Sequence, residues 1–271
     1  MHLKKLLLLS TLFLTQTLQA QHVIDLTYPY DENTIYWPTE TGFHLTKEAY
    51  GMNAKGYFYS ASRFSAPEHG GTHIDAPRHF SKNDFTVDQI PVSTLVGNAV
   101  VIDVRKQVKN NPDYAITVND IQQFEKKHHA LSSQDIVFFY TGFGSRWPDK
   151  KAYLGSDKPG DVAHLHFPGI SKEAATYLVK KNVKGLGIDT ASMDPGVETQ
   201  FWAHRVILGS NRFGLENVAH LDLLPVTGAT VVVAPMKIAG GSGGPTRIFA
   251  LLPRSSSTVT NKMLKIRHLS K

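Results

Sequence analysis

Residues 68–80 read EHGGTHIDAPRHF, and this stretch decides the fold and the chemistry to be expected of the chain. It places three histidines and one carboxylate within eleven residues, at His69, His73, Asp75 and His79. Neutral imidazole and carboxylate are ligands that divalent transition metals take up in water-activating sites. The chain has no cysteine, which excludes a thiolate site. The pattern therefore predicts an open, catalytic metal site.

The spacing predicts a strand that is interrupted by a bend. Two prolines bracket the run and two adjacent glycines interrupt it, so a helix is disfavoured. In a strand, His73 and Asp75 share a face about 6–7 Å apart and can meet at one ion. His69 would lie about 13 Å from His73 on a straight strand. The chain must therefore bend at Gly70 and Gly71.

The same run resembles the His-x-Gly-Thr-His-x-Asp-x-Pro-x-His-Phe signature of the metal-dependent cyclase family, which includes bacterial kynurenine formamidase and isatin hydrolase. The resemblance covers about residues 22–253 and extends to Trp37-Pro38, Gly187-Ile188-Asp189, Asp194 and Gly243-Gly244-Pro245-Thr246-Arg247. It implies an α/β protein with a three-layer β/β/α swivelling fold. It also implies a homo-oligomer, a dimer or a tetramer.

One segment supplies at most three ligands, so His204 and Glu216 are the candidates that complete the shell. Glu216 lies in an otherwise apolar stretch, where a buried carboxylate is costly unless it meets a cation. In the family, a histidine and a glutamate at matching places complete a second metal position, and Asp75 could bridge two ions. The alternative for each residue is a hydrogen-bonded structural role. The cofactor is thus one or two divalent ions, Zn or Mn, because N and O ligands suit both metals.

His79 follows the turn at Ala76-Pro77 and is better placed to line the pocket than to bind the ion. A divalent ion lowers the pKa of bound water toward 7 and polarises a carbonyl. Amide hydrolysis then needs a proton for the leaving nitrogen, and the ordinary pKa of histidine, near 6.5, suits that task. The resemblance gives the matching histidine this catalytic role. The alternative is a histidine that orients a ligand.

The two ends of the chain differ from the body. Residues 1–20 carry a basic start and a short leucine-rich stretch, which predicts an export signal and a periplasmic protein; an uncleaved anchor is the alternative. The tail 254–271 carries five cations and no acid, and is expected to be a flexible, solvated end rather than a membrane contact. Without these ends the chain has 22 Lys and Arg against 23 Asp and Glu, which argues against nucleic-acid binding.

The body, residues 21–253, is expected to form one domain with many strands and few helices. Short β-branched runs predict strands at Val23–Thr27, Ala99–Val104, Asp135–Thr141, Gly185–Asp189, Thr230–Ala234 and Arg247–Leu252. Thr117 and Ser171 are predicted to cap two helices, with Asp120 completing the first cap. A third helix is predicted over Glu198–Leu208.

A flat aromatic pocket is the weakest prediction, because most aromatic residues fill cores. The candidates are Trp37, Phe58, Phe80, Phe143 and Trp202. Gly240–Gly244 lacks the Lys-Ser/Thr ending of a phosphate loop, and Ser242 has no nucleophile-elbow context.

The leading hypothesis is a metal-dependent hydrolase of a small aromatic or cyclic amide, with N-formylkynurenine and isatin as competing substrates. The export signal counts against tryptophan catabolism in the cytosol. The rival hypothesis is an exported metal or metabolite binding protein without turnover.

Overall fold

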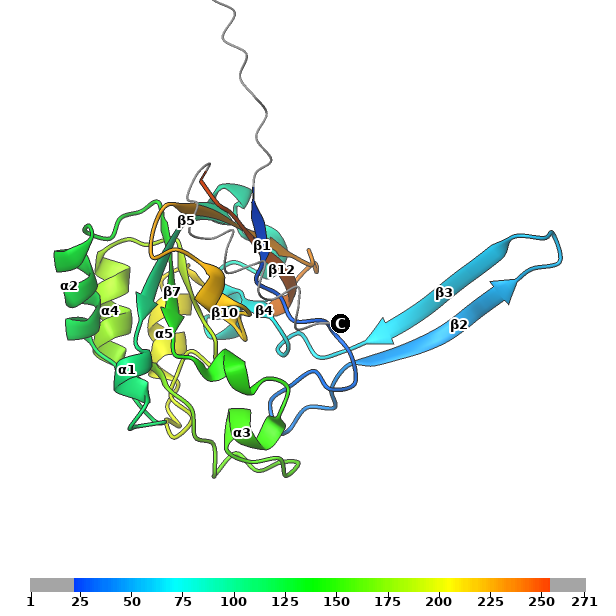
Figure 1. Ribbon diagram of the computed structural model, residues 1–271, viewed down its shortest axis with the longest axis horizontal. Helices are drawn as coiled ribbons and strands as arrows, with labels where there is room; N and C mark the ends of the chain where they lie inside the picture. The colour runs from blue at the N-terminus through cyan, green and yellow to red at the C-terminus, as the bar shows by residue number, and fades with distance from the viewer. Residues whose placement is uncertain (1–21, 254–271) are drawn as a thin grey trace, which may run out of the picture.

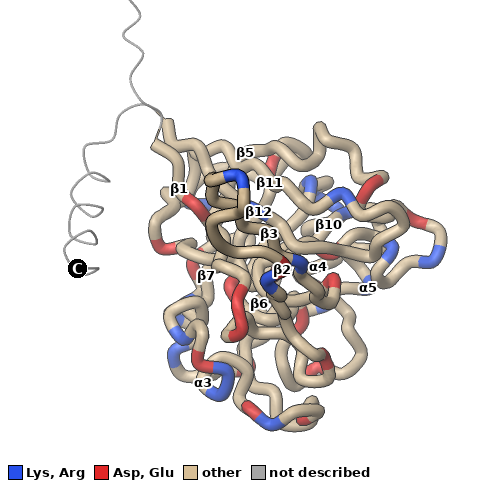
Figure 2. The backbone as a smooth tube through the Cα atoms, turned by 90° about the vertical axis from the view of Figure 1, so that its right-hand side faces the viewer, with Lys and Arg blue, Asp and Glu red and all other residues tan. Residues whose placement is uncertain are grey.

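The computed structural model describes residues 22–253 (Figure 1). The predicted export signal and the basic tail lie outside the described residues. Within the described part, no helix combines the length and the apolar character needed to cross a membrane. Lys and Arg are interspersed with Asp and Glu along the body (Figure 2), in keeping with its balanced charge.

The centre of the molecule is an eight-stranded mixed sheet that closes on itself. Its strands follow the order β1-β12-β11-β5-β7-β9-β10-β4, and β4 pairs with β12 as well as with β10. The strands are β1 (Val23–Asp25), β4 (His73–Asp75), β5 (Val96–Asp103), β7 (Asp135–Tyr140), β9 (Gly185–Ile188), β10 (Phe213–Glu216), β11 (Ala229–Pro235) and β12 (Gly243–Leu251). The short strand β4 therefore closes the ring, and it is the strand that carries the predicted ligands.

Three helices lie in the connections between parallel strands and cover one side of the sheet (Figure 1). They are α2 (Val118–Lys127), α4 (Lys172–Lys180) and α5 (Trp202–Leu208). The closed sheet supplies two β layers and the helices a third, so the α/β fold class and its layers agree with the prediction.

Strands β5 and β7 are buried on both faces, which explains their continuous apolar sequences. On β5, Ala99 and Val101 pack inside the ring of strands, whereas Val100 and Ile102 pack with the cluster that includes the helices. Because successive side chains of the strand point to opposite faces, β5 contributes residues to two separate hydrophobic cores.

The remaining elements are short, apart from one long hairpin. Strands β2 (His44–Met52) and β3 (Phe58–Ser65) form a separate two-stranded sheet, which the sequence did not predict. The minor elements are β6 (Ala115–Ile116), β8 (Gly169–Ile170), α1 (Arg105–Val108), α3 (Lys150–Leu154) and 3-10 turns at Pro77–His79, Val87–Gln89, Val92–Thr94, Phe143–Arg146 and Leu221–Leu223.

The third predicted helix begins four residues later than expected, at Trp202. The Glu198 carboxylate accepts the backbone N–H groups of Gln200 and Trp202, so residues 198–201 form a turn before the helix. Phe201 adopts a left-handed conformation, with φ 53°, and ends that turn.

The two predicted caps are present. Ser171 accepts the N–H of Ala174 at the start of α4. At the start of α2, the Asp120 carboxylate accepts the N–H and the hydroxyl of Thr117 at 2.8 and 2.7 Å and the hydroxyl of Tyr114 at 2.8 Å. Burial raises the pKa of Asp120, but these hydrogen bonds outweigh burial and hold the pKa below its ordinary value.

Asp120→Asn should lower the free energy of unfolding at pH 7 by about 1–3 kcal/mol, because the donors lose a charged acceptor. A carboxylate whose pKa is lower in the folded state contributes its full share of the folding free energy at pH values above its unfolded pKa, near 4. That contribution is lost as the pH falls through the folded pKa. The difference between wild type and variant should therefore shrink below about pH 4 in urea unfolding. Ser171→Ala removes a neutral cap and is the control. A loss for Asp120→Asn that stays constant with pH would contradict the assignment.

Candidate metal centre

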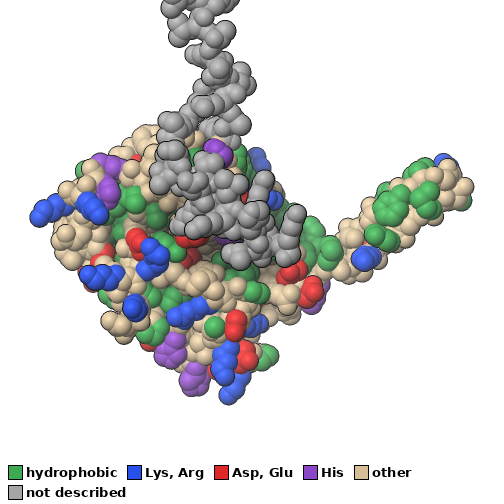
Figure 3. All heavy atoms as spheres, in the orientation of Figure 1, with side chains coloured by type: hydrophobic (Ala, Val, Ile, Leu, Met, Phe, Trp, Pro, Cys, Tyr) green, Lys and Arg blue, Asp and Glu red, His purple; other side chains and the backbone are tan. Residues whose placement is uncertain are grey.

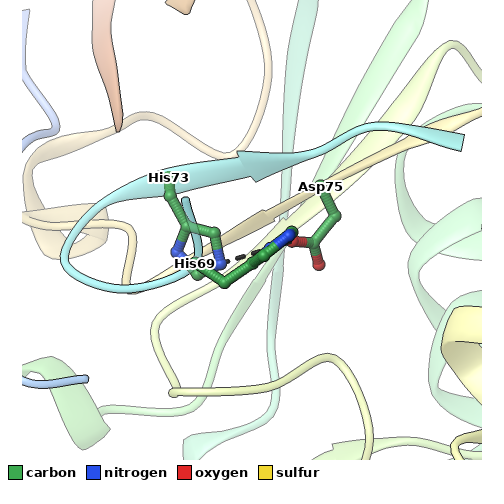
Figure 4. Close-up of side chains that lie close together, drawn as sticks. All are labelled: His69, His73 and Asp75. Atoms are coloured by element: carbon green, nitrogen blue, oxygen red, sulfur yellow. Dashed lines mark hydrogen bonds and ion pairs between the residues drawn. The ribbon is translucent and has the colours of Figure 1, made fainter. Parts of the chain in front are cut away.

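The predicted ligands converge where β4, β10 and α5 meet. Strand β4 pairs antiparallel with β10, and the register sets Glu216 directly opposite His73. His204 enters from helix α5 and is buried. Figure 4 shows His69 folded back toward Asp75 beside His73. The structure thus brings together five residues that the sequence separates by almost 150 positions.

The predicted bend is present at the two glycines. Gly70 and Gly71 have φ values of 153° and 57°. A Cβ at Gly70 would lie 2.0 Å from the ring of Tyr36, and one at Gly71 would lie 2.6 Å from the ring of Tyr30. The bend returns His69 to the cluster, with Nδ1 at 2.6 Å from Asp75 Oδ1. Only glycine fits both the dihedral angles and the space.

Two imidazole nitrogens face two carboxylates at the centre of the cluster. His73 Nε2 lies 3.3 Å from Asp75 Oδ1 and 3.5 Å from Glu216 Oε2. His204 Nε2 lies 3.3 Å from Asp75 Oδ2 and 3.2 Å from Glu216 Oε1. All four side chains are at least 95% buried. Asp75 stands between the two imidazoles, the place expected of a carboxylate that bridges two positions.

The outer nitrogens of the same imidazoles are held by the protein. His73 Nδ1 donates to the carbonyl of Gly71 at 3.0 Å. His204 Nδ1 donates to Asp194 Oδ2 at 2.6 Å. A histidine whose Nδ1 carries the proton presents the lone pair of Nε2, and such outer hydrogen bonds orient metal-binding imidazoles.

The unpaired donor atoms of the cluster fit a divalent ion. His73 Nε2 and Asp75 Oδ2 are buried and have no hydrogen-bond partner. Burial lowers the pKa of His73, but Asp75 and Glu216 outweigh it and raise that pKa above its ordinary value. Burial together with Asp75 raises the pKa of Glu216. Buried oxygens and nitrogens that attract positive charge this strongly are the donor set of a cation site.

His69 is held from the far side by a residue that the sequence did not assign to the site. Its Nε2 lies 2.9 Å from Ser242 Oγ, which donates to Glu68 Oε2 at 2.6 Å. Gly240–Gly244, rejected above as a phosphate loop, therefore carries a serine that orients His69.

His79 stacks on His69, with ring centroids 3.8 Å apart. No hydrogen bond within residues 22–253 uses its ring nitrogens. Burial lowers the pKa of His79 to about 4; Asp75 opposes the shift and the other histidines add to it. The expectation of a pKa near 6.5 therefore does not hold at this position, and the ring is neutral at pH 7. A nitrogen of His79 also lies within 4.8 Å of donor atoms of Asp75 and His204. Position alone thus allows both a proton-transfer role and a ligand role.

The cluster forms the floor of a cavity of about 250 Å³. Two of the five predicted aromatic residues, Trp37 and Phe80, line it. Phe58, Phe143 and Trp202 are not among the residues that line it. Phe58 lies on the β2–β3 hairpin and Phe143 in the core.

Trp202 is replaced in the cavity by the preceding residue, Phe201. The Trp202 ring instead contacts the cations of Lys172 and Arg205, which lie 3.5 and 4.2 Å from its centroid. Successive residues at a helix start point in different directions, so one position decides which ring faces inward. Tyr36, next to Trp37, also lines the cavity and was not predicted.

Comparisons with known proteins agree with this geometry. The Cyclase family model matches residues 24–195. Isatin hydrolase of Roseibium aggregatum is 33% identical over 211 residues, which cover 75% of this chain and 79% of that protein. Kynurenine formamidase of Bacillus cytotoxicus is 27% identical over 234 residues, or 85% and 97% of the two chains.

A solved structure of an isatin hydrolase bound to the product analogue thioisatinate superposes with a TM-score of 0.79 and 30% identity, covering 86% of this chain and 93% of that one. The fold and the site define a cyclase-type α/β hydrolase. The chain belongs to the cyclase family, as its sequence predicted.

Asp194 offers a test of how the site is held. Its carboxylate accepts hydrogen bonds from His204 Nδ1 and from the backbone N–H of Ala203. Asp194→Ala should therefore free the imidazole and weaken metal binding by about 10- to 100-fold. Calorimetric titration with Zn or Mn measures the effect. Asp149→Ala removes the carboxylate that caps α3 and is the matched control. Equal losses in both variants would show a general loss of stability instead.

Proposed function

We propose that this protein is a metal-dependent hydrolase that opens the C–N bond of a small cyclic amide of the isatin class. Hydrolysis of a C–N amide bond is the activity that the names of both relatives share, and the isatin hydrolase is the more similar in sequence. An N-formyl arylamine is the second candidate, because the kynurenine formamidase is matched over nearly its whole length.

The observation that carries this proposal is the open donor cluster on the floor of a small aromatic cavity. A volume of about 250 Å³ suits a one- or two-ring molecule, since pockets for larger, drug-sized ligands reach about 300–1,000 Å³. Trp37, Phe80 and Phe201 supply flat apolar walls. Such walls favour a planar ring and exclude water from the reacting bond.

His73, Asp75, His204 and Glu216 would hold a divalent ion, with His69 beside Asp75. When bound, such an ion supplies a Lewis acid that activates water and polarises the amide carbonyl. The N and O donors suit Zn and Mn alike.

The other residues act by position and by proton transfer. Hydrolysis forms a bond from a water oxygen to the carbonyl carbon and breaks the C–N bond, and the leaving nitrogen takes up a proton. His79 lines the cavity and has both ring nitrogens free of hydrogen bonds from the described residues. We propose that one of these nitrogens receives a proton from water and passes it to the leaving amine. In a cyclic amide, the carboxylate and the amine stay in one molecule.

The competing function is a binding protein that holds a metal or metabolite without turnover. A binder needs the ligands but no free imidazole beside them, so the position of His79 favours an enzyme. Metal-loaded protein assayed on isatin, N-formylkynurenine and a lactone of similar size separates these functions and ranks the substrates.

Asp75→Ala should abolish metal content and turnover together, because Asp75 faces three of the imidazoles. Elemental analysis and the rate of isatin opening measure the two effects. Asp113→Ala removes a half-buried carboxylate that pairs with His166 at 2.9 Å and should change neither. A folded, metal-free and fully active Asp75 variant would refute the metal-dependent mechanism.

His79→Ala should lower kcat by about 10²- to 10⁴-fold, the usual contribution of a general acid–base group, and should leave metal content unchanged. His164→Ala, which removes a histidine with a 75% exposed side chain, is the control. Loss of metal along with activity would identify His79 as a ligand and exclude the proton-transfer role.

A further inference from the structure

His69 differs from the other two imidazoles of the cluster in the nitrogen that faces the carboxylates. His73 and His204 turn Nε2 toward them. His69 turns Nδ1 toward Asp75, at 2.6 Å, and its Nε2 lies 2.9 Å from Ser242 Oγ on the other side (Figure 4 shows the ring beside Asp75). A neutral imidazole that binds an ion offers a lone pair and carries its proton on the other nitrogen. His69 must therefore carry its proton on Nε2.

The group that holds the outer nitrogen also differs. The outer partners of the other two imidazoles are the Gly71 carbonyl and the Asp194 carboxylate. A carbonyl and an ionised carboxylate can only accept, so these partners dictate which nitrogen is protonated. The hydroxyl of Ser242 can either donate or accept. By itself it would allow both tautomers of His69.

Glu68 removes this ambiguity. The Ser242 hydroxyl has one proton and donates it to Glu68 Oε2 at 2.6 Å, a length typical of a charge-assisted O–H···O⁻ bond. An ionised carboxylate has no proton to return, so the direction of this bond is fixed. Ser242 Oγ then offers only lone pairs to His69. The contact of 2.9 Å must therefore be a bond from Nε2–H to Oγ.

We propose that Glu68 is a positioning residue of the metal centre. Through Ser242 it holds the proton of His69 on Nε2 and leaves Nδ1 free to bind the ion. This inference rests on the metal-dependent function proposed above. Glu68 directly precedes His69 in the sequence, whereas Ser242 lies 173 positions beyond His69.

The glycines on either side of Ser242 allow this close approach. A Cβ at Gly241 would lie 2.8 Å from Glu68 Oε1, and one at Gly243 would lie 2.6 Å from Cε1 of His69. A side chain at either position would displace the carboxylate or the imidazole. The glycine-rich segment 240–244 thus has a function that does not involve phosphate.

Glu68 is not needed merely to hold this loop in place. The backbone N–H groups of Ala76 and Val87 donate to carbonyls of the loop at 2.9 Å each. Asp88 Oδ1 accepts the N–H of Gly240 at 3.0 Å. The loop is therefore anchored at several points, and the particular contribution of Glu68 is the direction of one hydroxyl group.

The surroundings of Glu68 support this role. Figure 3 shows Asp and Glu side chains spread among Lys and Arg over the visible face. In exposed pairs such as Arg105–Asp103, the carboxylate lies beside a guanidinium, at 2.6 Å. Among residues 22–253, Glu68 pairs with no Lys or Arg, and its two hydrogen bonds both go to Ser242. Its effect on the site must therefore pass through Ser242.

Calorimetric titration with Zn tests the proposal. Glu68→Ala frees the Ser242 hydroxyl to donate to Nε2, which favours a proton on Nδ1, so Zn binding should weaken about 10- to 100-fold. Glu68→Gln keeps an oxygen that accepts and should recover most of this loss. Asp88→Ala is the matched control, because Asp88 anchors the same loop without contacting the hydroxyl, and it should bind Zn as wild type does.

Two further measurements separate this role from a general structural one. Ser242→Ala removes the hydroxyl, so Glu68→Ala should cause no further loss of Zn affinity in that background. Nitrogen-15 NMR of Zn-loaded wild type should show a proton on Nε2 of His69 and none on Nδ1, with the signals assigned by a His69→Asn variant. Circular dichroism checks folding, and Ser242→Ala and the NMR spectrum test the proposal if Glu68→Ala does not fold.

Three results would overturn the proposal: equal losses in the Glu68→Ala and Asp88→Ala variants, additive losses in the double variant, or a His69 proton on Nδ1 in the Zn-loaded protein. None of these measurements depends on turnover. A wild type that gives the expected Zn affinities and spectrum but hydrolyses neither isatin nor N-formylkynurenine would refute the proposed function alone. A wild type that opens isatin, with a Glu68→Ala variant that binds Zn equally tightly, would refute the role of Glu68 alone.

Discussion

Two buried carboxylates, which contact two buried imidazoles, are the feature on which the rest of the structure depends. Asp75 and Glu216 lie in a region where an uncompensated charge is strongly destabilising. The protein surrounds them with His73 and His204 and orients each imidazole from outside, through Gly71 and Asp194. The arrangement is a preformed binding site for positive charge, whose geometry is held by the backbone and by side chains behind the ligands.

Closure of the sheet makes this site possible. Strand β4 is only three residues long, yet it pairs with β10 on one side and with β12 on the other. The first pairing brings Glu216 to His73, and the second brings the Ser242 loop to His69. The neighbouring strands β9 and β10 are buried along their whole length, so the ligands stand on a closely packed part of the molecule. A site that requires fixed distances benefits from such a scaffold.

The hairpin is linked to the site by its place in the chain. It leaves the body a few residues after Trp37 and returns a few residues before His69, and both residues line the cavity. The chain segments on either side of the hairpin therefore contribute to the same cavity.

The sequence determined what depends on neighbouring residues. The spacing of His69, His73 and Asp75, the bend at Gly70-Gly71 and the caps at Thr117 and Ser171 are local, because dihedral freedom and strand or helix periodicity act over a few residues. The family could be recognised for the same reason, since its signature is one short run. His204 and Glu216 were candidates by residue type and by resemblance to the family; no spacing in the sequence placed them.

The tertiary structure decided everything that depends on pairing at a distance. The register of β4 with β10 sets Glu216 opposite His73, and no local pattern encodes that register. Phe201 rather than Trp202 faces the cavity because of where α5 begins, and Phe58 lies far out on a hairpin that local patterns did not reveal. Short-range rules assign residue types to a site. Long-range packing chooses which of them meet, because the free energy of closing the sheet is shared among all its strands.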